Sequence, residues 1–346
     1  MLGQSLNKIN PTSYSNRSYN NKYGVPLSLF NINNKNFFGI FEVGMDKKGE
    51  IDSLTKIIKP NLGVITNVSY AHIKNFKNLN HIANAKSEII NNILSGGSII
   101  LNKDDHYFNF FKNKALKKNL KIISFSKKIN ADIRYIKTIK SKSKYLLFLS
   151  VNKKIIKLIL KENILSYLDN ILATVAVISY LVGLKKIKKN LFYNFNPPSG
   201  RGDIKKIKLK NKKINLIDES YNSNPLSLKF AINNFDKMNI ISKNKKILLG
   251  DMLELGKFSK KLHKDVIKNI NQSKINKVFV YGKYIDKAFN KIKTQKKGRV
   301  LKSKKEILNF LKNDLNNNDY LMVKGSNATG LNMIFSKIKK GNFNVV

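Results

Sequence analysis

The stretch "FNPPSGRGD", residues 195–203, divides the chain into two halves that share one pattern. Its two prolines and two glycines end any regular secondary structure. On either side of it, short apolar segments alternate with segments of helical period. Such alternation is typical of parallel sheets built from right-handed βαβ units. The sequence therefore predicts two α/β domains, residues 1–195 and residues 196–346.

The expected strands are apolar runs with little polar alternation, as in sheets that are covered on both faces. They lie at 36–43, 62–68, 96–102 and 120–126, and after the boundary at 214–220, 246–252, 277–282 and 320–326. Helices are expected at 80–94, 171–184, 227–235 and 261–270. A hairpin is expected over 144–160, turning at Asn152.

Composition excludes several classes of protein. The chain has no cysteine, which rules out disulfides and thiolate metal sites and fits a reducing cytosol. Its longest apolar run, residues 171–184, is shorter than the roughly 20 residues that span a bilayer, so it predicts a buried core helix. The N-terminal residues lack the apolar core of a signal peptide. We expect a cytoplasmic protein without membrane insertion.

The net charge of +45 comes from 66 Lys and Arg against 21 Asp and Glu. A charge of this size attracts anions in general. The lysines are scattered among Asn and Ile along the whole chain, which favours compositional drift over a dedicated polyanion-binding face. No RNA-binding aromatic motif or zinc-finger spacing is present, so nucleic acid is not the expected partner.

Three residues of the first half stand at or after expected strand ends. Glu42 closes one apolar strand, and His72 follows the next in "GVITNVSYAHIKNF", residues 63–76. A carboxylate suits Mg²⁺, whereas a histidine is more usual beside phosphate or a softer metal, and each alone also fits an ordinary loop. Lys86, on the following helix, carries no signal by itself among so many lysines.

Polar strand ends are denser in the second half. Residues 216–225, "LIDESYNSNP", place two acids, a serine, a tyrosine and two asparagines after a buried strand. These groups suit a nucleotide base and ribose, although Ser220, Asn222 and Asn224 also fit simple caps of the next helix. Asp251 and Glu254 follow the next strand.

Residues 321–330, "LMVKGSNATG", end a further strand on Lys324, Gly325 and Ser326, a good anion cradle at a helix start. Because parallel strands end at one sheet edge, the three polar strand ends of the second half predict one ligand site.

These strings, together with "NNKYGVPLSLF", "FEVGMDKKGEI" and "IANAKSEI", occur in the order seen in the Mur ligases, which the chain resembles over nearly its whole length. The "SYNSNP" and "GDMLELG" strings are most similar to the family member that joins D-alanyl-D-alanine to UDP-N-acetylmuramoyl-tripeptide. The implied fold is the family's central ATPase domain, incomplete at its N-terminal side, followed by a Rossmann-like C-terminal domain.

The resemblance implies an ATP-dependent amide ligase of peptidoglycan synthesis that needs ATP and Mg²⁺. The carboxylate of UDP-N-acetylmuramoyl-tripeptide would attack the γ-phosphate of ATP, and the amine of D-alanyl-D-alanine would then attack the acyl phosphate. Magnesium and cationic groups would offset the charge on the transferring phosphoryl group.

The resemblance also implies roles for residues of this sequence. The magnesium site would be Glu42, His72 and Lys86, the last carbamylated, and the catalytic set Lys86, His72 and Arg201. The nucleotide would be held by Asn170, Arg201, Asp218, Tyr221, Asn222 and Asn224. The peptide substrates would contact Asn20, Asn21, Lys324 and Ser326.

The sequence departs from the family pattern in four ways. It contains no Gly-Lys-Thr or Gly-Lys-Ser string for a phosphate loop, and the family's UDP-gripping N-terminal domain is missing. Ser166 stands where the family usually has histidine, and Asn327 where it tends to have arginine. Losing the loop should cost orders of magnitude in rate, so we expect little activity from this chain alone.

Three origins fit these departures: a truncated product, a misassigned start, or a split enzyme whose separate N-terminal segment supplies the loop. Two rival functions also stay open. One is another ligase of the superfamily such as folylpolyglutamate synthase, against which "SYNSNP" argues. The other is a non-catalytic, basic nucleotide- or polyanion-binding remnant.

Overall fold

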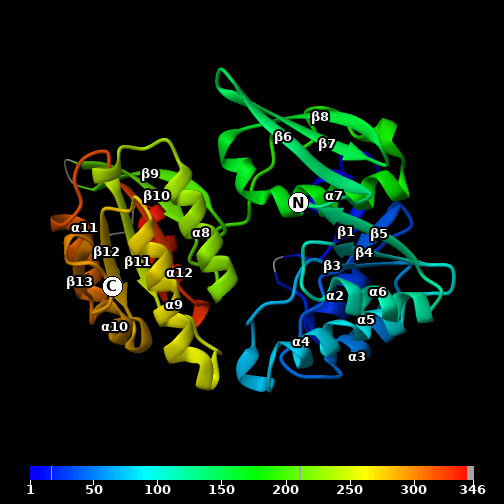
Figure 1. Cartoon of the computed structure of the whole chain (residues 1–346), viewed down its shortest axis with the longest axis horizontal. Coiled ribbons are helices and arrows are strands. Elements are labelled where there is room, and N and C mark those ends of the chain that lie inside the picture. The colour runs from blue at the N-terminus through cyan, green and yellow to red at the C-terminus, as the bar shows by residue number, and fades with distance from the viewer. Residues whose placement is uncertain (17, 210–211, 341–346) are drawn as a thin grey trace. The chain divides into compact units, whose positions relative to one another are not determined.

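The computed structural model describes residues 1–16, 18–209 and 212–340. Contacts divide the chain into two compact units, shown as ribbons in Figure 1. The first unit contains Met1–Val68 and Phe76–Phe195, and the second contains Ser69–Asn75 and Asn196–Val346. The short segment Ser69–Asn75 thus contacts the second unit although it is flanked by the first in sequence, which the sequence did not indicate.

The first unit has a six-stranded sheet in the order β3-β4-β5-β6-β7-β8. The strands β3 to β6 run parallel, and β7 and β8 add an antiparallel hairpin. The strands are β3 (Leu62–Ile65), β4 (Ser98–Asn102), β5 (Lys121–Ser126), β6 (Ile133–Ser141), β7 (Lys144–Val151) and β8 (Lys154–Leu160). The predicted hairpin is confirmed, with Asn152 and Lys153 in the left-handed backbone region that its tight turn requires.

Helices cover both faces of this sheet, as expected from its nearly continuous apolar strands. Ile100 of β4 packs in the core that contains α7, while its neighbours Ile99 and Leu101 pack in the core that contains α6. The helices are α1 (Leu2–Leu6), α2 (Gly24–Phe30), α3 (Glu50–Ile58), α4 (Leu79–Lys86), α5 (Glu88–Asn91), α6 (Phe108–Lys117) and α7 (Leu168–Leu181).

The helix α7 contains most of the apolar run that was predicted to be a core helix. Together with the turn before it, it is the one described helix long and apolar enough to cross a membrane, and half of the relevant window is buried inside the protein. Residues Ile171 to Ile178 are buried against the sheet, so the prediction of a core helix is confirmed.

Two expectations for the first unit were wrong in detail. The strand expected at 36–43 is only β2 (Phe38–Ile40), which is partly exposed and pairs with β1 (Thr12–Tyr14) in a separate two-stranded parallel sheet. The helix expected at 80–94 is interrupted at Ser87, whose backbone is shared by the ends of α4 and α5. Apolar residues continue past the ends of β2 and α5, which made both predicted elements too long.

The second unit has a six-stranded sheet in the order β13-β12-β11-β14-β10-β9. All neighbours run parallel except β9, which is antiparallel to β10, so the expected wholly parallel sheet is corrected to a mixed one. The strands are β9 (Asp203–Leu209), β10 (Lys212–Asp218), β11 (Lys245–Gly250), β12 (Lys277–Tyr281), β13 (Lys297–Val300) and β14 (Tyr320–Lys324).

In sequence, α8 to α11 each lie between two strands of the second unit, as a βαβ pattern requires, and α12 follows the last strand. They are α8 (Pro225–Lys237), α9 (Ser259–Gln272), α10 (Lys283–Phe289), α11 (Lys304–Asn313) and α12 (Leu331–Lys339). Phe310 of α11 and Phe335 of α12 are fully buried in the main core of this unit. Both units are therefore α/β, as the sequence predicts.

Candidate functional site

The carboxyl ends of β10, β11 and β14 bring the three polar segments of the second unit together, because these strands are parallel neighbours. Backbone bonds join them: Glu219 N–H donates to Val323 O (2.9 Å), and Ser326 N–H donates to Asp251 O (2.9 Å). The prediction that these three strand ends meet at one edge of the sheet is therefore confirmed.

Asp218, at the end of β10, is buried and fully engaged within its own domain. One carboxylate oxygen accepts from the backbone and hydroxyl of Ser220, and the other accepts from the Lys339 ammonium. Lys339 also donates to Asp203 at 2.9 Å. These two acids raise the pKa of Lys339, against the opposing effect of its burial. Asp218 therefore fixes the strand ends.

Lys324, at the end of β14, is 3% exposed and is held by three oxygens. Its ammonium donates to Asn222 O (3.0 Å) and, more weakly, to the backbone oxygen and carboxylate of Glu219 (3.4 Å each). Burial lowers the pKa of Lys324 and raises the pKa of Glu219, while the attraction between them opposes both shifts. Sequence reasoning gave no role to Glu219.

Arg201 and Tyr221 offer the accessible part of this edge. The Arg201 guanidinium lies 4.3 Å from the centre of the Tyr221 ring, a cation–π contact, and the Arg201 side chain is exposed. Tyr221 is fixed by its backbone N–H, which donates to Gly200 O (3.0 Å). Gly200 has a positive φ, and a Cβ there would lie 3.0 Å from Tyr221. A planar cation is thus held where a phosphate can reach it.

The side chains of two further residues that were predicted to bind ligands form hydrogen bonds within the domain. Asn224 caps α8, accepting from Ser227 N–H at 2.9 Å while Ser227 Oγ accepts from Asn224 N–H at 3.0 Å. Ser326 Oγ accepts from Leu253 N–H (2.8 Å) and donates to Ser223 O (3.1 Å). The helix-cap reading that the sequence left open for Asn224 is the one that the structure has.

His72 lies in the segment that contacts the second unit. Its Nδ1 is 2.7 Å from a carboxylate oxygen of Glu254, and Lys74 N–H donates to Glu254 O (2.9 Å). His72 and Glu254 both have positive φ, which is uncommon outside glycine. A carboxylate on one ring nitrogen is the arrangement that orients a histidine whose other nitrogen meets a metal or phosphate. The sequence named both residues but gave no sign that they pair.

In the first unit, Glu42 and Asn20 lie together. Asn20 Nδ2 donates to Glu42 Oε1 (2.9 Å), and Gly44 N–H donates to Asn20 O (2.8 Å). Glu42 is exposed, so its carboxylate is accessible as an oxygen ligand. Asn21 accepts from Gly24 N–H (2.9 Å) and thereby supports the start of α2. Asn170 is exposed in the first turn of α7.

Lys86 ends α4, and no hydrogen bond from its ammonium is present among the described residues. Burial lowers the pKa of this ammonium, and the nearby Asp105 carboxylate opposes the effect. A lowered pKa increases the fraction of neutral amine, which is the form that reacts with carbon dioxide to give a carbamate. Lys86 thus fits the carbamylated lysine that the resemblance implies.

Comparison with known proteins assigns the class. The chain matches the Mur ligase middle domain over residues 1–178 and the Mur ligase, glutamate ligase domain over residues 201–327. The chain therefore belongs to the Mur ligase family, whose members are ATP-dependent amide ligases.

Its curated relatives carry a more particular name. The UDP-N-acetylmuramoyl-tripeptide–D-alanyl-D-alanine ligase of Buchnera aphidicola subsp. Baizongia pistaciae is 34% identical, covering 98% of this chain and 72% of that protein. The ligase of the same name from Rickettsia prowazekii is 27% identical, covering 92% and 70%.

Solved structures agree with this assignment of the fold. MurF from Acinetobacter baumannii matches with a TM-score of 0.84 and 25% identity, covering 98% of this chain and 73% of that chain. MurF from Thermotoga maritima in complex with ADP matches in fold with a TM-score of 0.82, at 20% identity, covering 99% and 76%.

Proposed function

We propose that this chain supplies the middle and C-terminal domains of a ligase that joins D-alanyl-D-alanine to UDP-N-acetylmuramoyl-tripeptide at the expense of ATP. The observation that carries the proposal is the 34% identity to a ligase of that name over 98% of the chain. The site supports it, because an exposed arginine on a tyrosine ring stands beside a buried lysine at one sheet edge.

In the proposed reaction, the peptide carboxylate attacks the γ-phosphorus of ATP and ADP leaves, giving an acyl phosphate. The amine of D-alanyl-D-alanine then attacks the acyl carbon, an amide forms, and phosphate and a proton are released. Arg201 would face the phosphates, since its side chain is exposed and its guanidinium lies over the Tyr221 ring. The segment that contains Lys324 would face the acyl phosphate or the incoming dipeptide, with the Lys324 ammonium holding Asn222 and Glu219 in place.

Glu42, His72 and carbamylated Lys86 would hold Mg²⁺, which supplies charge neutralisation when bound. The donor set suits this ion, since Glu42 and a carbamate offer oxygen ligands and His72 Nδ1 lies 2.7 Å from a Glu254 carboxylate oxygen, which leaves the other ring nitrogen for the ion. Glu42 and Lys86 belong to the first unit and His72 to the second, so their meeting at one ion stays a prediction. Asn170 would contact the adenine, and Asn20 and Asn21 the peptide substrate.

Three residues predicted to touch ligands are better proposed as positioning residues. The side chains of Asp218, Asn224 and Ser326 already bond to neighbouring groups of the fold. Their proposed role is to fix Tyr221, Asn222 and Lys324 in place. A ligand that displaced these bonds would leave buried polar groups unpaired, which is costly.

A second candidate function is nucleotide binding without catalysis, and one observation favours it. No Gly-Lys-Thr or Gly-Lys-Ser string occurs in the 346 residues, so the loop amides and lysine that hold ATP phosphates are not among them. Under this alternative ATP binds through Arg201 and Tyr221 but is not split.

The experiment is a phosphate-release assay with ATP, Mg²⁺, UDP-N-acetylmuramoyl-tripeptide and D-alanyl-D-alanine. The purified chain is tested alone and with the separately expressed part of the Buchnera relative that this chain does not cover. We expect release that requires the dipeptide and rises by orders of magnitude with the added part. Mass spectrometry of the amide product checks the reaction.

The matched variants are Arg201→Ala and Arg134→Ala, both at exposed arginines. We expect Arg201→Ala to lower the rate at least tenfold and Arg134→Ala to leave it unchanged. ATP binding without any release, with the added part present, would reject the ligase and support the non-catalytic alternative. Release that ignores the dipeptide would reject the proposed acceptor.

A further inference from the structure

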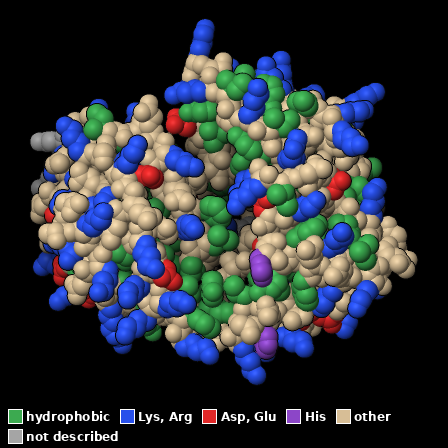
Figure 2. All heavy atoms as spheres, in the orientation of Figure 1, with side chains coloured by type: hydrophobic (Ala, Val, Ile, Leu, Met, Phe, Trp, Pro, Cys, Tyr) green, Lys and Arg blue, Asp and Glu red, His purple; other side chains and the backbone are tan. Residues whose placement is uncertain are grey.

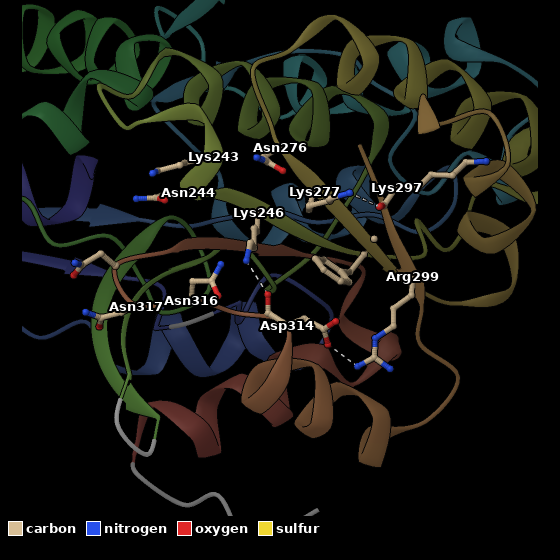
Figure 3. Close-up of a pocket in the computed structure, with 13 residues that line it drawn as sticks. Lys243, Asn244, Lys246, Asn276, Lys277, Lys297, Arg299, Asp314, Asn316 and Asn317 are labelled. Carbon is tan, nitrogen blue, oxygen red and sulfur yellow. Dashed lines mark hydrogen bonds and ion pairs between the residues drawn. The ribbon is translucent and has the colours of Figure 1, made fainter. Parts of the chain in front are cut away.

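A hollow lies at the opposite edge of the C-terminal sheet, where β11, β12 and β13 begin rather than end (Figure 3). Its volume is about 760 Å³. The strands start at Lys245, Lys277 and Lys297, and the loop before β14 completes the lining. We call this hollow the amino-edge pocket. It does not share residues with the proposed ligase site, which uses the carboxyl ends of the strands.

The acidic groups around the amino-edge pocket are already neutralised. Asp319 pairs with the buried ammonium of Lys246 at 2.6 Å, and Asp314 pairs with Arg299 at 2.6 Å. Lys246 also donates to Asp314 O at 2.7 Å, a bond drawn in Figure 3. These pairs hold the walls together and leave no uncompensated carboxylate among the described residues that line the pocket.

Several hydrogen-bond donors that line the amino-edge pocket, by contrast, have few or no partners. Lys243 has neither an ion pair nor a hydrogen bond among the described residues, and Lys277 makes one bond, to Lys297 O at 3.1 Å. The side-chain amides of Asn244, Asn276 and Asn316 also line the pocket without partners in the described chain. The Lys297 ammonium does not contribute, because it lies 6.0 Å from the Phe289 ring and points away in Figure 3.

One donor of the pocket wall is buried and unpaired. Nε of Arg299 is buried and has no hydrogen-bond partner among the described residues, although its Nη2 bonds to Asp314. Buried polar atoms are nearly always paired, so an unpaired one in a pocket wall calls for an explanation. Because this atom has almost no surface open to solvent, a molecule in the pocket reaches it only if the Arg299 side chain shifts, so the case for an anion site stands on the lysines and not on this atom.

We propose that the amino-edge pocket binds an oligophosphate anion, such as a free polyphosphate or the phosphate tail of a nucleotide. The wall carboxylates are paired with cations, whereas Lys243 and Lys277 keep most of their donors, which favours an anionic ligand with several oxygens. The volume exceeds what a single phosphate needs and lies in the range of small-molecule sites. Phe279 is only 4% exposed, so the pocket offers no aromatic face on which a nucleic-acid base could stack.

The proposal must be separated from the general attraction of a chain with charge +45. Lys and Arg side chains are spread over the face shown in Figure 2, so weak anion binding is expected everywhere. A built pocket differs in two measurable ways. Its binding depends on two particular lysines, and it shields those lysines from reagents.

The test is calorimetric titration of the full chain with tripolyphosphate, without Mg²⁺, at physiological salt. The site variant is Lys243→Gln/Lys277→Gln, and the matched control is Lys261→Gln/Lys264→Gln, two exposed lysines of α9. We expect the site variant to weaken the tightest binding at least tenfold and the control to change it less than twofold. Acetylation of lysines, read by mass spectrometry, should show protection of Lys243 and Lys277 by tripolyphosphate.

Equal weakening in both variants, or no protection of Lys243 and Lys277, would overturn the proposal and leave only diffuse charge. Two further probes distinguish the sources of phosphate. ATP that protects no better than tripolyphosphate identifies the phosphate chain alone as the ligand, and stronger protection by ATP identifies a nucleotide. Protection by a short single-stranded RNA but not by tripolyphosphate would contradict an oligophosphate site.

Discussion

Two lysines, one in each domain, have lowered pKa values but different surroundings. Lys324 in the C-terminal domain is held by Glu219 and Asn222 through hydrogen bonds of 3.0 to 3.4 Å. Lys86 in the middle domain has no hydrogen-bond partner among the described residues, and only Asp105 acts on it through space. In both, burial is the largest cause of the lowered pKa.

The difference teaches what each lysine can do. A buried ammonium that is paired and hydrogen-bonded is part of the fold, and its removal leaves a partner charge stranded. An ammonium without such bonds loses its proton more readily and is available for covalent chemistry. Lys324 therefore belongs to a prearranged edge, whereas Lys86 is suited to modification. Two predictions test this comparison, and a third, on Asn224, tests the cap of α8 beside the same edge.

The largest effect is expected for Lys324→Met. It leaves the Glu219 carboxylate without its partner in a site where burial already raises the Glu219 pKa, so the free energy of unfolding should fall by about 3–5 kcal/mol. Urea unfolding, with hydrogen exchange of β10 and β14 to identify the domain, measures it. The double variant Lys324→Met/Glu219→Gln should recover part of the loss. A loss below about 1 kcal/mol for the single variant would show that Lys324 is not a structural cation.

An intermediate effect is expected for Asn224→Ala. It removes the Asn224 side-chain oxygen that accepts from Ser227 N–H at the start of α8. Loss of such a capping oxygen typically lowers the free energy of unfolding by about 1 kcal/mol. The control is Asn224→Asp, which keeps the capping oxygen and should cost less. In the phosphate-release assay, a changed KM for ATP in Asn224→Asp at unchanged stability would contradict a purely positioning role.

The smallest effect on the free energy of unfolding is expected for Lys86→Met, and this effect should depend on pH. A lowered folded pKa means that burial of the charged ammonium costs free energy at pH 7, so the variant should be equal to or more stable than the native chain by up to about 1 kcal/mol. In the native chain stability rises with pH between the folded pKa of Lys86 and its ordinary value of 10.5.

The advantage of Lys86→Met should therefore shrink as the pH rises from 7 toward 10, measured by urea unfolding in carbon-dioxide-free buffer. The same series with bicarbonate added tests modification, because a carbamate on the native lysine would be absent from the variant. An advantage that grows with pH would show that the sign of the pKa shift is wrong.

Several parts of this protein follow from local sequence. The turn at Asn152 requires positive φ, which asparagine tolerates, and the flanking apolar runs fix the hairpin. The apolar run of α7 predicts a buried helix because no polar face is left to meet water. The strand ends at Asp218 and Lys324 meet because parallel neighbours end at the same edge.

Other parts depend on contacts between distant residues and carry no local signal. His72 and Glu254 are 2.7 Å apart across 182 positions of sequence, and Lys339 reaches Asp218 from the last described helix. Sequence reasoning named one member of each pair, or both, but could not join them, because a lysine or histidine looks the same whether it is paired or solvated. The amino-edge pocket was missed for the same reason, since its lysines were part of a scattered charge.

By itself, then, the sequence determined the α/β class, the family resemblance and the order of the polar strand ends, because hydrophobic period and turn residues act over a few positions. Only the tertiary structure decided which of those polar groups are hydrogen-bonded within the fold and which are left for a ligand. Asp218, Asn224 and Ser326 are used by the fold, whereas Arg201, Glu42 and Lys86 remain accessible or unbonded. That distinction depends on burial and hydrogen-bond geometry, which are set by partners that lie far away in the chain.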